Sequence, residues 1–200
     1  MTFVSTMRIT VLTFILGLLA ACGTPTGEKE PPLPMGDFLL GHNIVIADDA
    51  QAGPLSRKAD PDDWEAALKE AINDRLGDYN GDHYFHIGTH VDAYVLAVPG
   101  VPMVATPKSV LIISVNVFDD RTGKRLTDKP KQLTVFERSE KSTFIIGSGI
   151  RNSKAVQMRN LSRNAARLIQ RYLLENPEWF GLPPRVVREV DDPAAAASNN

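Results

Sequence analysis

Three histidines and two aspartates lie close together in the middle of the chain, and these residue types can bind transition metals. The set is Asp82, His83, His86, His90 and Asp92. One zinc ion needs its ligands about 2 Å from a common centre. Apolar and polar residues alternate here, so we expect a strand, which would hold His86 and His90 ~13 Å apart and point His83 to the opposite face. We therefore predict no metal site and no cofactor, with the histidines solvated or hydrogen-bonded.

A second place where chemistry could occur is the sequence Gly147-Ser148-Gly149. Its backbone N–H groups could face an anion at the start of a following helix. The Lys-Ser/Thr of a phosphate-binding loop is absent, and Ile146 breaks the Gly-x-Ser-x-Gly spacing of hydrolases. No base for Ser148 can be singled out. We expect a flexible connection, predict no catalytic residue, and expect that the protein is not an enzyme.

Four arginines recur at every fourth position near the C-terminus: Arg159, Arg163, Arg167 and Arg171. Like charges at this spacing on a helix repel by a few tenths of a kcal/mol per pair, about 0.2–0.5, so we expect a compensating anion. The anion could be internal, because the helix expected at residues 61–76 is acidic. It could also be external: acidic lipid, lipopolysaccharide phosphate or a partner protein. The sequence is compatible with both alternatives.

The connection at residues 98–107 is unusually apolar for a loop, since loops usually lie in water. Its apolar side chains include Val101, Met103 and Val104. They could cap one end of the core. They could instead contact a lipid or a groove in a partner protein, because exposed apolar patches often mark interaction sites.

The single cysteine, Cys22, closes a short apolar stretch at the N-terminus. Arg8 is the only charge before it, and residues 9–21 are fewer than the ~20 of a membrane-spanning helix, so the stretch is typical of a secretory signal. Leu19-Ala20-Ala21-Cys22 resembles the lipobox of bacterial lipoproteins, which implies cleavage before Cys22 and its acylation, for instance with palmitate. In that family Asp after the cysteine commonly marks the inner membrane; Gly23 therefore implies the outer membrane, facing the periplasm.

Composition favours one folded domain. Without residues 1–21 the chain has 179 residues, with 21 basic and 24 acidic side chains and a formal charge of −3. That length can bury a core, and the near-neutral balance argues against nucleic acid as a partner. We predict a signal peptide at 1–21, a flexible tether at 22–41, an α+β domain at 42–182 and a disordered tail at 183–200.

Hydrophobic periodicity predicts the secondary structure. We expect strands at 43–47, 83–97, 110–118 and 133–138, and helices at 61–76 and 153–175. Residues 144–146 either extend the last strand or form a further short one. Asp60 and Pro61 form the helix start that is easiest to recognise. In the long strand 83–97, Phe85, Ile87, Thr89, Val91, Ala93, Val95 and Ala97 are expected on the packed face. The fold predicted is α+β, β-α-β-β-β-α, with an antiparallel sheet of three to four strands and two helices packed on one face.

This layout, with a lipobox, a tether and an Asp-x-x-Thr-Gly hairpin beginning at Asp119, resembles small periplasm-facing lipoproteins. The LptE/YajG-like proteins and the auxiliary lipoproteins of ABC transport systems are the families concerned. The resemblance carries over no site residue beyond the lipobox cysteine. We expect a non-enzymatic outer-membrane lipoprotein that acts as a tethered binding or scaffold module for an envelope protein or an amphiphile. The alternative is an auxiliary lipoprotein for lipid or lipopolysaccharide transport and assembly.

Overall fold

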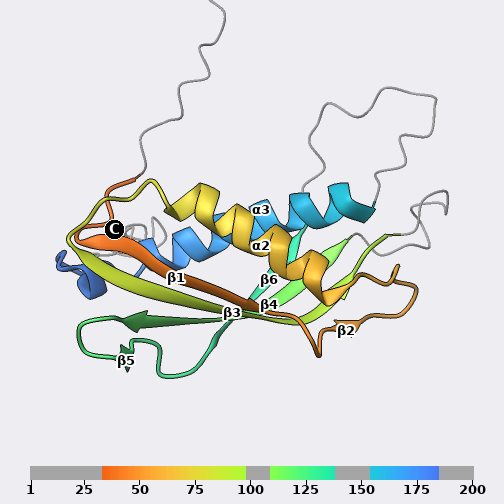
Figure 1. The fold of residues 1–200 in the computed structure, drawn as a ribbon, viewed down its shortest axis with the longest axis horizontal. Coiled ribbons are helices and arrows are strands. Elements are labelled where there is room, and N and C mark those ends of the chain that lie inside the picture. The colour runs from red at the N-terminus through yellow and green to blue at the C-terminus, as the bar shows by residue number, and fades with distance from the viewer. Residues whose placement is uncertain (1–32, 98–108, 138–153, 185–200) are drawn as a thin grey trace, which may run out of the picture. The chain divides into compact units, whose positions relative to one another are not determined.

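A computed structural model describes residues 33–97, 109–137 and 154–184 of the chain (Figure 1). The chain divides into two compact units, residues 1–33 and 34–200, and every described helix and strand lies in the second unit. There a sheet carries two long helices on one face, α2 (Pro61–Leu76) and α3 (Lys154–Leu174) (Figure 1). The predicted α+β class and the placement of both helices on one side of the sheet are confirmed.

The sheet has six strands rather than the predicted three to four. They are β1 (Phe38–Ile46), β2 (Gln51–Ala52), β3 (His83–Val95), β4 (Val110–Asp119), β5 (Lys124–Arg125) and β6 (Lys131–Phe136). The order is β1-β3-β4-β5, with β2 beside β3 and β6 beside β4. β1 begins at Phe38, so residues 38–41, expected in the tether, belong to the sheet.

The prediction of a purely antiparallel sheet is wrong, because β1 and β2 both run parallel to β3. The whole of α2 lies between β1 and β3 along the chain, and a helical connection of that length returns the chain to the end of the sheet from which it left. The pairs β3–β4 and β4–β6 are antiparallel. The sheet is therefore mixed.

The start of α2 confirms the prediction from Asp60 and Pro61. The Asp60 side chain accepts a hydrogen bond from the Asp62 backbone N–H at 3.1 Å, and Pro61 occupies the first turn. Aspartate at this position satisfies a backbone donor that has no partner within the helix. The apolar stripe of α2 then faces the core, where Trp64, Leu68 and Ile72 are fully buried.

The prediction of the packed face of β3 is confirmed as far as Val91 and is wrong beyond it. The register with β4 shifts between Val91 and Ala93. Such a β-bulge adds one residue to the strand, so the side chains beyond it change faces. Tyr94 and Leu96 are consequently buried in place of the expected neighbours. The Tyr94 hydroxyl accepts a hydrogen bond from the Ala59 N–H at 3.0 Å, which fixes the chain just before α2.

The core lies between the sheet and the two helices. Alternate residues of β4 and one stripe of α3 contribute to it beside the stripe of α2. The fully buried residues of β4 and α3 include Leu111, Ile113, Val115, Val117, Leu161, Ala165, Ile169 and Leu173. After α3 the short helix η2 (Pro177–Phe180) returns Phe180 to the core, where it is 1% exposed. Neither α2 nor α3, the long helices of the described part, is long and apolar enough to cross a membrane.

Candidate functional site

His90 is held between two carboxylates on the face of the sheet opposite the helices. Its Nε2 lies 2.7 Å from Asp49 Oδ1, in the turn after β1, and its Nδ1 lies 2.8 Å from Asp92 Oδ1. Both ring nitrogens can donate at once only when the imidazole is protonated. Ser114 and Gln132 donate to the second oxygen of Asp92 at 2.7 and 3.1 Å. This network joins β3, β4, β6 and the turn at Asp49.

The charges of this network reinforce one another. The hydrogen bond to Asp92 is the main reason why the pKa of His90 is raised, and Asp49 adds to it against the opposing effect of burial. For Asp92, burial on its own would raise the pKa. The hydrogen bonds from His90, Ser114 and Gln132 together outweigh burial, and the pKa of Asp92 is lowered. Both shifts favour the charged forms, so protonated His90 and ionised Asp92 link the strands as a structural ion pair.

The stability of the domain should depend on the protonation of His90. Because the folded pKa is raised, protonated His90 stabilises the fold fully below about pH 6.5, and this contribution is lost as pH rises through the folded pKa. We expect His90→Gln to destabilise the protein most at about pH 6 and progressively less towards about pH 9. Urea unfolding across this range measures the difference. Asp49→Asn should weaken the same pH dependence, and a constant difference between wild type and His90→Gln would contradict the assignment.

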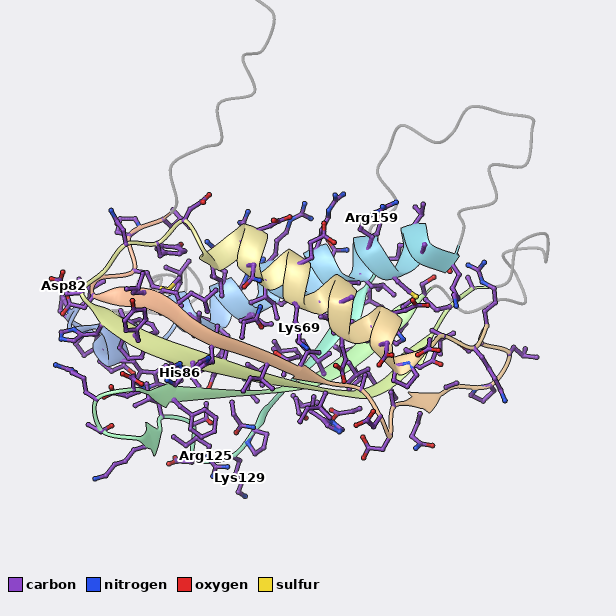
Figure 2. All side chains as sticks on the ribbon, viewed as in Figure 1. Lys69, Asp82, His86, Arg125, Lys129 and Arg159 are labelled. Carbon is purple, nitrogen blue, oxygen red and sulfur yellow. The ribbon has the colours of Figure 1, made fainter. Side chains whose placement is uncertain are left out.

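His86 and His83 make separate structural contacts. The His42 backbone N–H donates to His86 Nδ1 at 2.9 Å, so the ring proton is on Nε2, which donates to Asp120 Oδ1 at 2.9 Å. His86 thereby connects the bulge in β1 with the hairpin after β4 (Figure 2). His83 Nε2 accepts a hydrogen bond from Arg121 Nη1 at 3.0 Å. The expectation that these histidines are hydrogen-bonded is confirmed.

Among the residues that the structure describes, no group of three or more His, Cys, Asp or Glu side chains is placed to hold a metal ion. Several residues singled out in the sequence lie outside the described ranges. These are the lipobox cysteine Cys22, the loop residues Val101, Met103 and Val104, and the Gly147–Gly149 sequence. The roles proposed for them stay predictions.

The four arginines are all exposed on α3, but they do not form one straight stripe. Successive helical residues turn by about 100°, so residues four apart are displaced by about 40° and the row winds around the helix. Arg159, at its start, projects from the side of α3 away from the sheet (Figure 2). Arg167 and Arg171 reach the side of α3 that borders β6, because both line a hollow there together with residues of that strand.

The internal pairing that the sequence left open does not involve these arginines in the described part of the chain. The ion pair found there between α3 and α2 joins Lys154 Nζ to Asp63 Oδ2 at 3.4 Å. None of the four arginines is in an ion pair with a described residue. Arg167 Nη1 donates to the neutral Asn164 side-chain oxygen at 2.8 Å, so no described residue compensates its charge.

α3 runs alongside β6 in the opposite direction. Asn164 Nδ2 donates to the Phe136 carbonyl at 3.0 Å, and eight residues later the Tyr172 ring lies 5.4 Å from Lys131 Nζ. Between these contacts the helix and the strand border a hollow of about 210 Å³. We call this region, lined by Thr134, Val135, Phe136, Asn164, Arg167, Leu168 and Arg171, the β6–α3 surface. The arginines and a strand at 133–138 are visible in the sequence, but nothing in these residues indicates that the strand lies beside α3.

A second hollow, of about 290 Å³, is lined by residues with apolar side chains. It lies where the chain enters and leaves the domain and is lined by Pro34, Met35, Leu173, Leu174, Pro177, Phe180, Leu182 and Pro183. The Asp37 N–H donates to the Phe180 carbonyl at 3.0 Å and holds the two ends of the domain together. A signal for it in the sequence is the aromatic pair Trp179-Phe180, which follows the last predicted helix.

No protein-family model matches the chain, and neither does any curated protein sequence. Solved structures with a similar fold include protein XCC0632 from Xanthomonas campestris, of family model DUF330, at 14% identity and a TM-score of 0.44, covering 76% of this chain and 94% of that one. A minor lipoprotein from Acinetobacter baumannii matches at 19% identity and a TM-score of 0.34, covering 70% of this chain and 94% of that one. PelC from Paraburkholderia phytofirmans, a dodecamer, matches at 11% identity and a TM-score of 0.31, covering 66% of this chain and 88% of that one. Likenesses this distant assign no function.

Proposed function

We propose that the protein is a non-enzymatic lipoprotein of the cell envelope whose folded domain binds a partner within reach of a membrane. The sequence Leu19-Ala20-Ala21-Cys22 supports the anchor, and Gly23 supports the outer membrane with the domain facing the periplasm. Two or more acyl chains are needed for firm attachment, because one chain alone binds a membrane only marginally. The partner is an envelope protein or an amphiphile.

One observation supports a binding role above the others: the uncompensated arginines of α3. The side chains of His83, His86 and His90 are already engaged in contacts that hold strands and turns together. The arginines instead present exposed, permanent positive charge without an ion pair to any described residue. Guanidinium groups bind carboxylate and phosphate through paired hydrogen bonds, which suits recognition of an anionic partner.

Arg167→Gln/Arg171→Gln should weaken capture of the partner without unfolding the domain. We expect cross-linked partner recovered from detergent-solubilised envelopes to fall to about a tenth of the wild-type amount, since charge contacts at interfaces are commonly worth more than 1.4 kcal/mol. Arg125→Gln/Lys129→Gln is the matched control, because it removes the same charge from the opposite side of the sheet (Figure 2). Equal recovery from both double variants would contradict the proposed role of α3.

The apolar loop remains a further predicted contact, outside the described residues. Met103→Asp/Val104→Asp tests it in the same cross-linking experiment. Unchanged recovery of partners from this variant would remove Val101, Met103 and Val104 from the interface.

The apolar hollow at the ends of the domain favours a second candidate function, that of an auxiliary lipoprotein in lipid or lipopolysaccharide transport. Its walls are aliphatic, proline and aromatic side chains, as expected of a site for an acyl chain. Lipid extraction and mass spectrometry of the purified protein test this alternative. Absence of any lipid beyond the covalent anchor would count against it.

A further inference from the structure

We propose that the β6–α3 surface binds an extended segment of a partner protein, which adds a strand to the edge of β6 and places acidic side chains beside Arg167 and Arg171. The inference rests on the proposed binding function and specifies its ligand. The ligand class is a strand with an acidic residue at every second position. Three features of the described residues support it: free backbone groups, the spacing of the arginines, and the charge around the edge.

The outer edge of β6 has backbone hydrogen-bonding groups without a partner among the described residues. Antiparallel neighbours alternate between residues that bond each other and residues whose backbone groups point outwards. The Glu137 N–H donates to the Ser109 carbonyl at 3.1 Å, so in this register Leu133 and Val135 bond to β4 while Gln132, Thr134 and Phe136 face the edge.

A side chain confirms this assignment. Asn164 Nδ2 donates to the carbonyl of Phe136, as it could only if that carbonyl points away from β4. The groups left at the edge are the N–H and C=O of Gln132 and Thr134 and the N–H of Phe136. They recur every two residues, as the backbone of an added strand requires.

The arginines are spaced to match such a strand. Arg167 and Arg171 are four residues apart on α3, which corresponds to a rise of ~6 Å along the helix axis. Alternate side chains of a β-strand are ~6.6 Å apart. Because α3 runs along β6, acidic residues at positions i and i+2 of an added strand would each lie beside one guanidinium. The intervening side chains would lie on the other face of the sheet, next to Phe136, which is 59% exposed.

Charge distinguishes this occupant from two others. A second copy of the chain, paired edge to edge through β6, would bring two sets of α3 arginines together and oppose its own docking. A lipid headgroup could neutralise the arginines but has no backbone to pair with Gln132 and Thr134. The edge on the far side of the sheet is already contacted by α2, where Glu65 accepts from the Ala47 N–H at 3.2 Å and Asn43 donates to the Lys69 carbonyl at 3.0 Å.

A synthetic peptide with glutamate at every second position and valine or threonine between them tests the proposal against the full-length protein in detergent. Fluorescence anisotropy should show binding that is weakened about tenfold by methylating the peptide nitrogens on the edge-facing side. Methylation of the nitrogens one residue along should have little effect. Thr134→Pro should weaken binding similarly, because it removes an outward N–H that β4 does not use. A peptide of the same composition with its glutamates contiguous should bind more weakly.

Amide hydrogen exchange provides a second measurement that does not depend on any variant. In the free protein the N–H groups of Gln132 and Thr134 should exchange much faster than those of Leu133 and Val135, and the peptide should protect them. Protection already present in the free protein would mean that residues 138–153 or a second copy occupy the edge, and it would overturn the proposal.

The failures of the two proposals can be told apart. Peptide binding that is lost in Arg167→Gln/Arg171→Gln but is indifferent to methylation would overturn strand addition and leave the anionic binding function standing. If anionic phospholipid vesicles bind as well as the peptide, and methylation of the peptide does not change its binding, the ligand would be a lipid surface and not a strand. No peptide binding, or binding that is independent of the arginines, would also overturn the inference, whereas the envelope cross-linking result would still decide the proposed function.

Discussion

Phe38→Ala should lower the free energy of unfolding by about 3–5 kcal/mol, the usual cost of deleting a fully buried phenylalanine ring. Phe38 is 0% exposed, and its ring lies within 6 Å, centroid to centroid, of three others: Tyr79 at 5.6 Å, Phe85 at 5.8 Å and Phe180 at 5.3 Å. These aromatic contacts join β1, β3, the chain after α2, and η2. Their loss leaves a cavity that the surrounding backbone cannot easily close, because it belongs to four separate segments.

Urea unfolding of the purified protein measures this effect, and Phe136→Ala is the matched control. Phe136 is also the side chain of a strand residue, but it is 59% exposed, so its truncation should change stability by no more than about 0.5 kcal/mol. Phe38→Leu should fall between the two because it keeps most of the apolar volume. A Phe38→Ala variant as stable as Phe136→Ala would show that the first half of β1 is not packed as described.

The elements predicted well are those whose signals are local. The cap at Asp60 and Pro61 and the strict alternation of β4 each involve residues within one element, and the structure agrees with both. The direction of β1 could not be predicted from alternation, since parallel and antiparallel strands share the same period. The bulge after Val91 is invisible for a similar reason: it depends on how β3 pairs with β4, not on the composition of β3.

The same distinction between local signals and contacts of distant segments applies to the candidate site. A row of arginines at every fourth position is visible in the sequence, and the structure finds all four exposed. Their position beside β6 depends on the contact of Asn164 with Phe136. These two residues are 28 positions apart, and nothing in the sequence indicates that they meet. The partners of His90 were equally hidden, because Asp49 lies in a turn 41 residues earlier. Contacts between distant segments are what a single sequence lacks.

Cys22→Ala should release the protein from firm membrane attachment, the largest effect expected on its location. Each buried methylene of an acyl chain contributes ~0.8 kcal/mol, so the chains of a mature lipoprotein together provide far more than any contact of the folded domain. We expect the wild type to incorporate labelled palmitate and to stay with the membrane fraction after washes with high salt and urea. The variant should take up no label and be largely extracted by the same washes.

An uncleaved leader could also hold the protein at the membrane, so both palmitate incorporation and resistance to the washes are needed to identify the acyl anchor. Residues 9–21 are too few to span a bilayer, for which ~20 apolar residues are needed, and an unprocessed leader should therefore hold less firmly than acyl chains. Gly23→Asp keeps the cysteine and should keep the palmitate label. By the lipobox resemblance it should also move the protein from outer-membrane to inner-membrane fractions on a density gradient. Cys22→Ala that remains equally membrane-bound through the washes would show that attachment does not depend on this cysteine, and the domain would then have to bind the envelope through its own surfaces.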